Sequence, residues 1–214
     1  MRDLVYIYKH TDTDELRYSL RSATRFLSFD RVWVVGDETG LDVNHIYVPQ
    51  RGSSHEDVGN KIRTIVDHEG ISEDFILMND DFFLMESTSL PYYYSDTLEN
   101  RIKTHKGKYT QRVYNRFPNG YWCELHFPIM YNKKYLKKVL DDYEVVKTMA
   151  LRTYYCNALQ ITPKYSKDYK VTTVEELYKA WDYPFFSTSD EVARTSQFTW
   201  IISTLFPEKT KYEN

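Results

Sequence analysis

Apolar residues near the N-terminus form short continuous runs that alternate with amphipathic segments. Short apolar runs bounded by polar residues, glycine or proline are typical of buried strands, whereas apolar residues three or four positions apart indicate helices. The strands predicted in this way are residues 4–8, 31–35, 44–48 and 75–78. The helices predicted in the same region begin near residue 15 and span residues 60–68. This order is typical of an α/β sheet with a right-handed crossover, and the most apolar run, 75–78, should form its central strand.

The pattern after Glu86 is less regular. Helical periodicity predicts helices at residues 133–147, 148–160 and 174–181, so we expect the C-terminal half to be mainly helical. A length of 214 residues suits a single α/β domain. Within it we expect a sheet region at 1–88 and a helical region at 89–214.

Composition narrows the class of protein. Apolar residues make up 42% of the chain and charged residues 28%, which excludes a disordered or fibrous protein. The formal charge of −3 and a pI near 6.1 disfavour tight, sequence-independent binding to nucleic acid. Cys123 and Cys156 form neither a disulfide framework nor a metal motif, so we expect free thiols. The chain has no apolar segment typical of a signal peptide or a membrane span, and it is predicted to be a cytoplasmic, soluble protein.

Two adjacent carboxylates, Asp80 and Asp81, follow Asn79 directly after the most apolar predicted strand. Like charges this close destabilise each other unless a cation or hydrogen-bond donors compensate them. Open α/β sheets bind ligands at the carboxyl ends of their strands, where such a pair can hold magnesium or manganese (Mg²⁺ or Mn²⁺) against a diphosphate. The alternative, more frequent for a bare Asp-Asp pair, is a turn whose acids only cap the next element.

Five short strings stand out along the chain. The first two are residues 14–22, Asp-Glu-Leu-Arg-Tyr-Ser-Leu-Arg-Ser, and residues 79–84, Asn-Asp-Asp-Phe-Phe-Leu. They are followed by His126-Phe127-Pro128, Tyr154-Tyr155 and the string 206–213. In sequence and in order, these strings resemble the Stealth family of sugar-phosphate transferases, whose central signature is similar to the first two. The resemblance implies an enzyme that uses a nucleotide-sugar donor and a hydroxyl acceptor. It also implies an α/β nucleotide-sugar-transferase-like fold, of the GT-A or Rossmann-like type, with a mixed sheet and flanking helices.

One string departs from the family. The family usually opens with Val-Tyr-Thr-Trp-Val-Asp-Gly, but here residues 5–10 read Val-Tyr-Ile-Tyr-Lys-His, and Lys9 stands near the place of the acid. Transfer of the sugar itself therefore stays open beside transfer of the sugar phosphate.

Basic residues are the candidates for binding the donor. Arg17 and Arg21 are one helical turn apart and can present two guanidinium groups to a diphosphate, or else form a solvated helix face. The candidates on the helix at 60–68 for contacts with the base or the phosphates are Asn60, Lys61 and Arg63, and their alternative role is the polar side of an amphipathic helix.

His126 is the candidate general base, because an imidazole of near-neutral pKa can take the proton of an acceptor hydroxyl. The alternative is a structural histidine. Asp81 joins it as a catalytic candidate through the metal, and Arg152 can neutralise charge on the transferring phosphate or form an ordinary salt bridge. His55 has a counterpart in the Ser-His that precedes the family's central helix, and is a candidate for the acceptor side.

We therefore expect a metal-assisted transferase that moves a sugar-1-phosphate from a nucleotide sugar to a hydroxyl acceptor, with a glycan as the preferred acceptor. A glycosyltransferase acting on a glycan or on a modified DNA base is the first alternative. A non-catalytic glycan-binding module, with its many Tyr and Trp as stacking platforms, is a second. A metal-dependent nuclease is a third, which the acidic pI disfavours.

Overall fold

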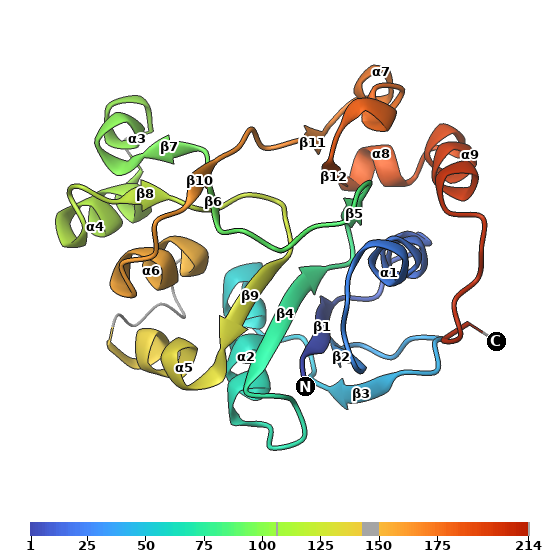
Figure 1. The fold of residues 1–214 in the computed structure, drawn as a ribbon, viewed down its shortest axis with the longest axis horizontal. Coiled ribbons are helices and arrows are strands. Elements are labelled where there is room, and N and C mark those ends of the chain that lie inside the picture. The colour runs from blue at the N-terminus through green and yellow to red at the C-terminus, as the bar shows by residue number, and fades with distance from the viewer. Residues whose placement is uncertain (106, 143–149, 214) are drawn as a thin grey trace.

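The computed structural model describes residues 1–105, 107–142 and 150–213. Its main sheet has the strand order β3-β2-β1-β4-β9 (Figure 1). These strands are β1 (Asp3–Tyr8), β2 (Val32–Gly36), β3 (Asn44–Tyr47), β4 (Asp74–Asn79) and β9 (Ile129–Asn132). The first four strands in that order are parallel, and β9 is antiparallel to β4. The strands predicted at the N-terminus are confirmed, with β4 in the interior of the sheet and β1 at its middle.

Helices cover both faces of this sheet, because successive side chains of a strand point to opposite sides. On one face Leu4 and Tyr6 of β1 pack with Leu16 and Leu20 of α1 (Glu15–Phe26). On the other face Val5 packs with Ile62, Ile65 and Leu136, among others. These side chains belong to α2 (Ser54–Asp67) and α5 (Lys133–Asp142), which Figure 1 shows on the side of the sheet away from α1.

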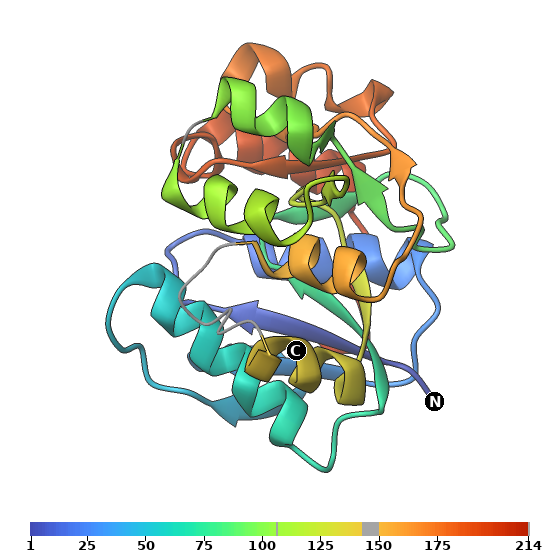
Figure 2. The ribbon, with the colours of Figure 1, turned by 90° about the vertical axis from the view of Figure 1, so that its left-hand side faces the viewer.

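A smaller sheet continues the chain beyond β4. It has the order β11-β12-β5, from β5 (Phe82–Leu84), β11 (Lys170–Val171) and β12 (Phe185–Thr188). Asp80 and Asp81 alone separate β4 from β5, so the acidic pair lies where the two sheets meet. Phe83 and Phe186 pack in a separate core with α7 (Val174–Leu177), α8 (Asp190–Ala193) and α9 (Ser196–Leu205), which Figure 2 shows stacked above the main sheet.

Short elements complete the fold on the side of β9 (Figure 1). The strands are paired as β6 (Tyr93–Tyr94) with β10 (Lys164–Tyr165), and β7 (Asp96–Thr97) with β8 (Tyr121–Trp122). The helices are α3 (Leu98–Thr104), α4 (Lys108–Arg116) and α6 (Leu151–Ala158), and a 3₁₀ turn at Ala180–Asp182 follows α7.

The helices predicted after Glu86 are each found in part. Of the helix predicted at 133–147 the structure describes α5 to Asp142, and of that at 148–160 it describes α6. Residues 143–149 lie outside the described residues. The helix predicted at 174–181 is α7 followed by the 3₁₀ turn. No helix in the described ranges is both long and apolar enough to span a bilayer.

Candidate active site

The acidic pair carries a high local charge. Burial, and then the charges of Asp81, Glu15 and Asp190, raise the pKa of Asp80 to about 8. Burial also raises the pKa of Asp81. Because each of these acids disfavours the ionisation of its neighbours, the turn is suited to a positively charged ligand.

Glu15, the first residue of α1, is the member of this acidic group that the sequence did not single out. Its carboxylate accepts hydrogen bonds from the hydroxyls of Thr188 (2.6 Å) and Thr13 (2.8 Å). Burial nevertheless raises the pKa of Glu15, and the charges of Asp81 and Asp190 add to the effect. Its position in the string 14–22 was the available signal, but a carboxylate in the first turn of a helix is ordinary.

His126 is held by two residues, Asp168 just before β11 and Lys170 at its start. Its Nδ1 lies 2.8 Å from Oδ2 of Asp168, and its backbone N–H donates to Oδ1 of the same carboxylate at 3.1 Å. The ammonium of Lys170 lies 3.2 Å from Nε2. Since an ammonium only donates, this network assigns the proton to Nδ1 and leaves the Nε2 lone pair as the acceptor.

Charged residues around His126 act on the pKa of Asp81 in the acidic turn. The charge of His126 when it is protonated, and the charges of Lys170 and Arg152, each oppose the effect of burial on the pKa of Asp81. Burial acts to raise the pKa of Asp168, but the hydrogen bonds and charge of His126 hold it below its usual value. Asp168 is therefore a carboxylate that orients the imidazole.

Arg152 lies in the first turn of α6 and reaches back to the loop that carries His126. Its guanidinium donates to the backbone carbonyl of Phe127 and lies over the ring of Phe82, 5.5 Å from its centroid. Phe82 also meets the His126 ring edge-on at 6.0 Å. The predicted candidates Asp81, His126 and Arg152 are thus brought into one neighbourhood.

A cavity of about 250 Å³, here called the α2 cavity, opens beside the acidic turn. Its lining contains three cationic residues, namely Lys9, Arg51 and Lys61. It also contains Asn79 and Asp80 at the end of β4. Gly36 allows the backbone to pass close to Tyr8 beside this cavity. Its φ is +138°, which favours glycine, and a Cβ there would lie 1.9 Å from the carbonyl oxygen of Tyr8.

The other residues predicted on α2 are engaged elsewhere. Arg63 donates to Asp141 (3.1 Å) and to the carbonyl of Leu140, and neither it nor Asn60 belongs to the cavity lining. His55 stacks on Tyr109, with ring centroids 6.3 Å apart. Side chains of a helix point in different directions around its axis, and Lys61 is the one of the three predicted residues that faces the cavity.

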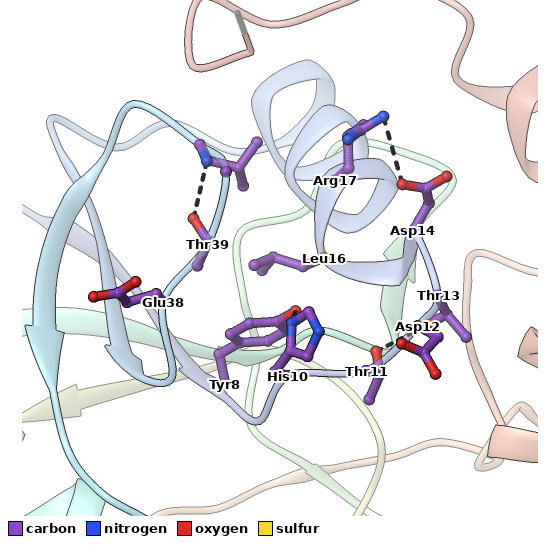
Figure 3. A pocket seen from close by; sticks show the side chains of 12 residues that line it. Tyr8, His10, Thr11, Asp12, Thr13, Asp14, Leu16, Arg17, Glu38 and Thr39 are labelled. Carbon is purple, nitrogen blue, oxygen red and sulfur yellow. Dashed lines mark hydrogen bonds and ion pairs between the residues drawn. The ribbon is translucent and has the colours of Figure 1, made fainter.

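A second cavity, here called the α1 cavity, has a volume of about 360 Å³ and lies between the β1–α1 and β2–β3 loops (Figure 3). Its charged rim residues are Asp12, Asp14, Arg17 and Glu38. Tyr8 lines both cavities. Figure 3 shows Arg17 turned toward Asp14, and this ion pair measures 3.4 Å.

Arg21 does not line the α1 cavity beside Arg17. Its guanidinium makes two short hydrogen bonds to Glu213 (2.6 and 2.8 Å) and one to the carbonyl of Phe206 (2.8 Å). The side chain is only 9% exposed. Where the helical spacing predicts a donor-binding group, the structure shows an anchor for the C-terminal segment, because the chain end returns to α1 only in the folded protein.

A divalent cation fits the acidic turn in part. Among the described residues no group of three or more His, Cys, Asp or Glu side chains is arranged to hold a metal ion. Asp80 and Asp81 do supply the hard oxygen donors that Mg²⁺ and Mn²⁺ prefer. Burial and then the charge of Asp81 raise the pKa of Asp80, and a bound cation would favour its ionised form.

No protein-family model matches this chain, and no curated protein matches it in sequence. Solved structures do match. A crystal structure of the galactosyltransferase LgtC in complex with donor and acceptor sugar analogues superposes with a TM-score of 0.54 at 10% identity, over 98% of each chain. The chain has the LgtC fold.

A second LgtC structure, of an active-site mutant of that enzyme, matches with a TM-score of 0.54 at 9% identity, over 94% of this chain and 95% of that one. The predicted nucleotide-sugar-transferase-like α/β fold, with its parallel-rich sheet and flanking helices, is thereby confirmed.

Proposed function

We propose that this protein is a metal-assisted enzyme that transfers sugar-1-phosphate from a nucleotide sugar to a hydroxyl acceptor. The observation that carries the proposal is the placement of an oriented histidine beside the acidic turn at the junction of the two sheets. The LgtC fold supports a nucleotide-sugar donor, and the Stealth-like strings support transfer of the phosphate together with the sugar.

The donor nucleotide is assigned to the α2 cavity rather than to the larger α1 cavity. Lys9, Arg51 and Lys61 supply positive charge there, whereas the rim of the α1 cavity is mainly acidic. Asp80 lines the α2 cavity, which sets the diphosphate next to the turn. Mg²⁺ or Mn²⁺ held by Asp80 and Asp81 would neutralise diphosphate charge and so favour departure of the nucleotide.

The His126 group supplies the proton chemistry. Nε2 accepts the proton of the acceptor hydroxyl as its oxygen attacks the sugar-bound phosphorus. The bond from that phosphorus to the bridging oxygen breaks, and a nucleoside monophosphate leaves with the electron pair. Asp168 stabilises the imidazolium that forms. Lys170, which covers Nε2 in the free protein, turns to the phosphate when donor and acceptor bind.

Transfer of the sugar alone is the second candidate, and the likeness to a galactosyltransferase favours it. In that reaction the acceptor oxygen attacks the anomeric carbon, the sugar–oxygen bond breaks, and a nucleoside diphosphate leaves. The same base and the same metal serve both reactions, so the leaving nucleotide distinguishes them.

The deciding experiment incubates the protein with a panel of nucleotide sugars, Mn²⁺ and glycan acceptors, and identifies the released nucleotide by mass spectrometry. A monophosphate supports sugar-phosphate transfer, and a diphosphate supports glycosyl transfer. An Asp80→Asn, Asp81→Asn double variant is the control for a contaminating enzyme. Binding of glycans without turnover of any donor would instead identify a glycan-binding module.

A further inference from the structure

The wall of the α2 cavity contains a buried carboxylate whose hydrogen-bonding capacity is half used. Asp57 is 8% exposed, and its Oδ2 accepts from the ammonium of Lys61 at 2.6 Å. Its Oδ1 is covered by protein atoms and has no hydrogen-bond partner among the described residues. A buried polar atom left without a partner destabilises the protein, so a ligand whose donor reaches this oxygen, once the carboxylate has turned, relieves that cost.

Helix geometry turns this pair toward the cavity. Ser54, Asp57, Val58 and Lys61 all line it, and positions i, i+3, i+4 and i+7 form one stripe along a helix. Lys61 is 2% exposed, so its ammonium keeps one fixed place in the wall. The pair therefore offers a ligand an acceptor beside a donor, held on a rigid element.

The position of the pair relative to the acidic turn suits a nucleotide. Lys61 packs against Gly36 at the end of β2, and its Cε would lie 3.0 Å from a Cβ there. Asp80 follows the end of β4, and β1 lies between β2 and β4. Two strand spacings of about 4.8 Å thus separate the two strand ends, which is the order of the span from a nucleobase to its diphosphate.

We propose that Asp57 and Lys61 select the base of the donor nucleotide by reading an imide edge, as in uracil or thymine. Asp57 accepts the ring N–H and Lys61 donates to the adjacent carbonyl oxygen. A turn about the broad Cβ–Cγ torsion of Asp57 keeps Lys61 on one oxygen and directs the other at the base. Cytosine and adenine have an unprotonated ring nitrogen at the corresponding place, which would face the carboxylate lone pair. This inference rests on the proposed use of a nucleotide donor.

The first test changes the ligand and leaves the protein intact. Calorimetry with Mn²⁺ compares UDP, N3-methyl-UDP, CDP and GDP. Because a site built around a polar contact rejects ligands that lack it, we expect UDP to bind at least about tenfold more tightly than CDP and N3-methyl-UDP. Equal binding of UDP and N3-methyl-UDP overturns the inference. Tighter binding of GDP than of UDP overturns the choice of a pyrimidine imide.

The second test reverses the polarity of the hydrogen bond. Asp57→Asn keeps an oxygen for Lys61 and replaces the other with an NH₂ donor, so the ratio of UDP to CDP affinity should fall about tenfold or more. Asp67→Asn is the matched control, because Asp67 lies on the same helix, pairs with Lys137 and is not part of the cavity lining. This control should keep the ratio of the unmodified protein.

The possible outcomes distinguish failure of base selection by Asp57 and Lys61 from failure of the proposed function. An Asp57→Asn protein that folds, as judged by circular dichroism, and keeps the ratio contradicts the inference while nucleotide binding stands. If that variant does not fold, the N3-methyl comparison on the unmodified protein decides. Failure of the unmodified protein to bind any nucleotide contradicts the proposed function itself.

Discussion

The two cavities on either side of Tyr8 differ in charge more than in size. The α1 cavity is the larger, about 360 Å³ against about 250 Å³, and its rim carries three carboxylates and one guanidinium, besides His10. The α2 cavity has three cationic residues, of which Lys61 forms a buried ion pair with Asp57, and Asp80 of the acidic turn belongs to its lining. Size alone would place the donor in the α1 cavity, whereas charge and contact with Asp80 place it in the α2 cavity.

The C-terminal segment accounts for part of this difference. Leu41, which lines the α1 cavity, forms a β-bridge with Glu213, and Glu213 in turn pairs with Arg21. The backbone of Leu41 and the side chain of Arg21 therefore hold the C-terminal segment near the α1 cavity.

The largest effect is expected for His126→Ala. Loss of a general base typically lowers the rate by about 10²–10⁴-fold and changes substrate binding little. The acidic limb of the pH–rate profile should also flatten, since the group that must be deprotonated is gone. His10→Ala, at the α1 cavity, should keep turnover within about twofold of the unmodified protein. A His126→Ala protein that binds donor poorly, melts early and keeps its pH profile would show that His126 is structural.

Asp81→Asn should lower turnover by about 10²–10³-fold, the order expected when a preorganised charge is removed from an active site. The fold should survive, because one member of a repelling pair is neutralised. Thermal shift with Mn²⁺ measures metal binding: the unmodified protein should be stabilised, and the variant much less so. Asp12→Asn serves as the control at the α1 cavity. An equal shift in all three proteins would remove the metal site from the acidic turn.

Lys9→Ala should weaken the binding of a nucleoside diphosphate about three- to tenfold, since Lys9 is an exposed member of the α2 cavity and its charge is partly screened. Arg17→Ala tests the competing expectation that the α1 helix binds the donor. Calorimetry on both variants ranks the cavities. A greater loss for Arg17→Ala than for Lys9→Ala would move the donor to the α1 cavity.

The smallest effect on activity is expected at Glu213, where stability should change instead. Burial acts to raise the pKa of Glu213, but hydrogen bonds from Arg21 and Thr210 hold it below its usual value. A depressed folded-state pKa contributes stability above the unfolded pKa of about 4.5, and this contribution is lost as the pH falls through the folded value. Glu213→Gln should therefore lower the melting temperature at pH 7, by the equivalent of about 1–3 kcal/mol.

The difference in melting temperature between this variant and the unmodified protein should shrink as the pH falls below about 4.5 and through the lowered pKa of Glu213. The variant should keep its nucleotide affinity at pH 7. Melting curves across this pH range check the first expectation and calorimetry checks the second. A difference in melting temperature that persists unchanged into acid would mean that the Arg21–Glu213 ion pair is not its source.

Much of the N-terminal sheet was predictable because its signals are local. Strands β1, β2 and β4 are apolar on both faces, and α1 shows its apolar stripe in the sequence. The smaller sheet was not predicted. Its strand β5 has only three residues, which is too short for a clear pattern. Its partner β12 lies about a hundred positions further along the chain, so no hairpin turn between them signals the pairing.

The residues of the candidate site also fall into two groups, those that the sequence pointed to and those that only the fold placed there. The Asp80–Asp81 turn and His126 were visible as short strings, and the structure places them near one another. Asp168 and Lys170 were not visible in the sequence, because an isolated acid and a lysine that begins a two-residue strand have no periodic pattern. They are 42 and 44 positions from His126, and the fold brings them to it.

The sequence by itself determined strands β1 to β4, helix α1 and the acidic turn, since apolar periodicity and a charged pair at a strand end are properties of neighbouring residues. Tertiary structure decided which charged groups are available. Arg17 and Arg21 look equivalent along α1, yet Arg21 is buried against Glu213 at 2.6 Å, while Arg17 stays half exposed at a cavity and lies 3.9 Å from the same carboxylate. The physical reason is that a charged side chain is assigned its role by the partners that surround it, and those partners come from distant parts of the chain.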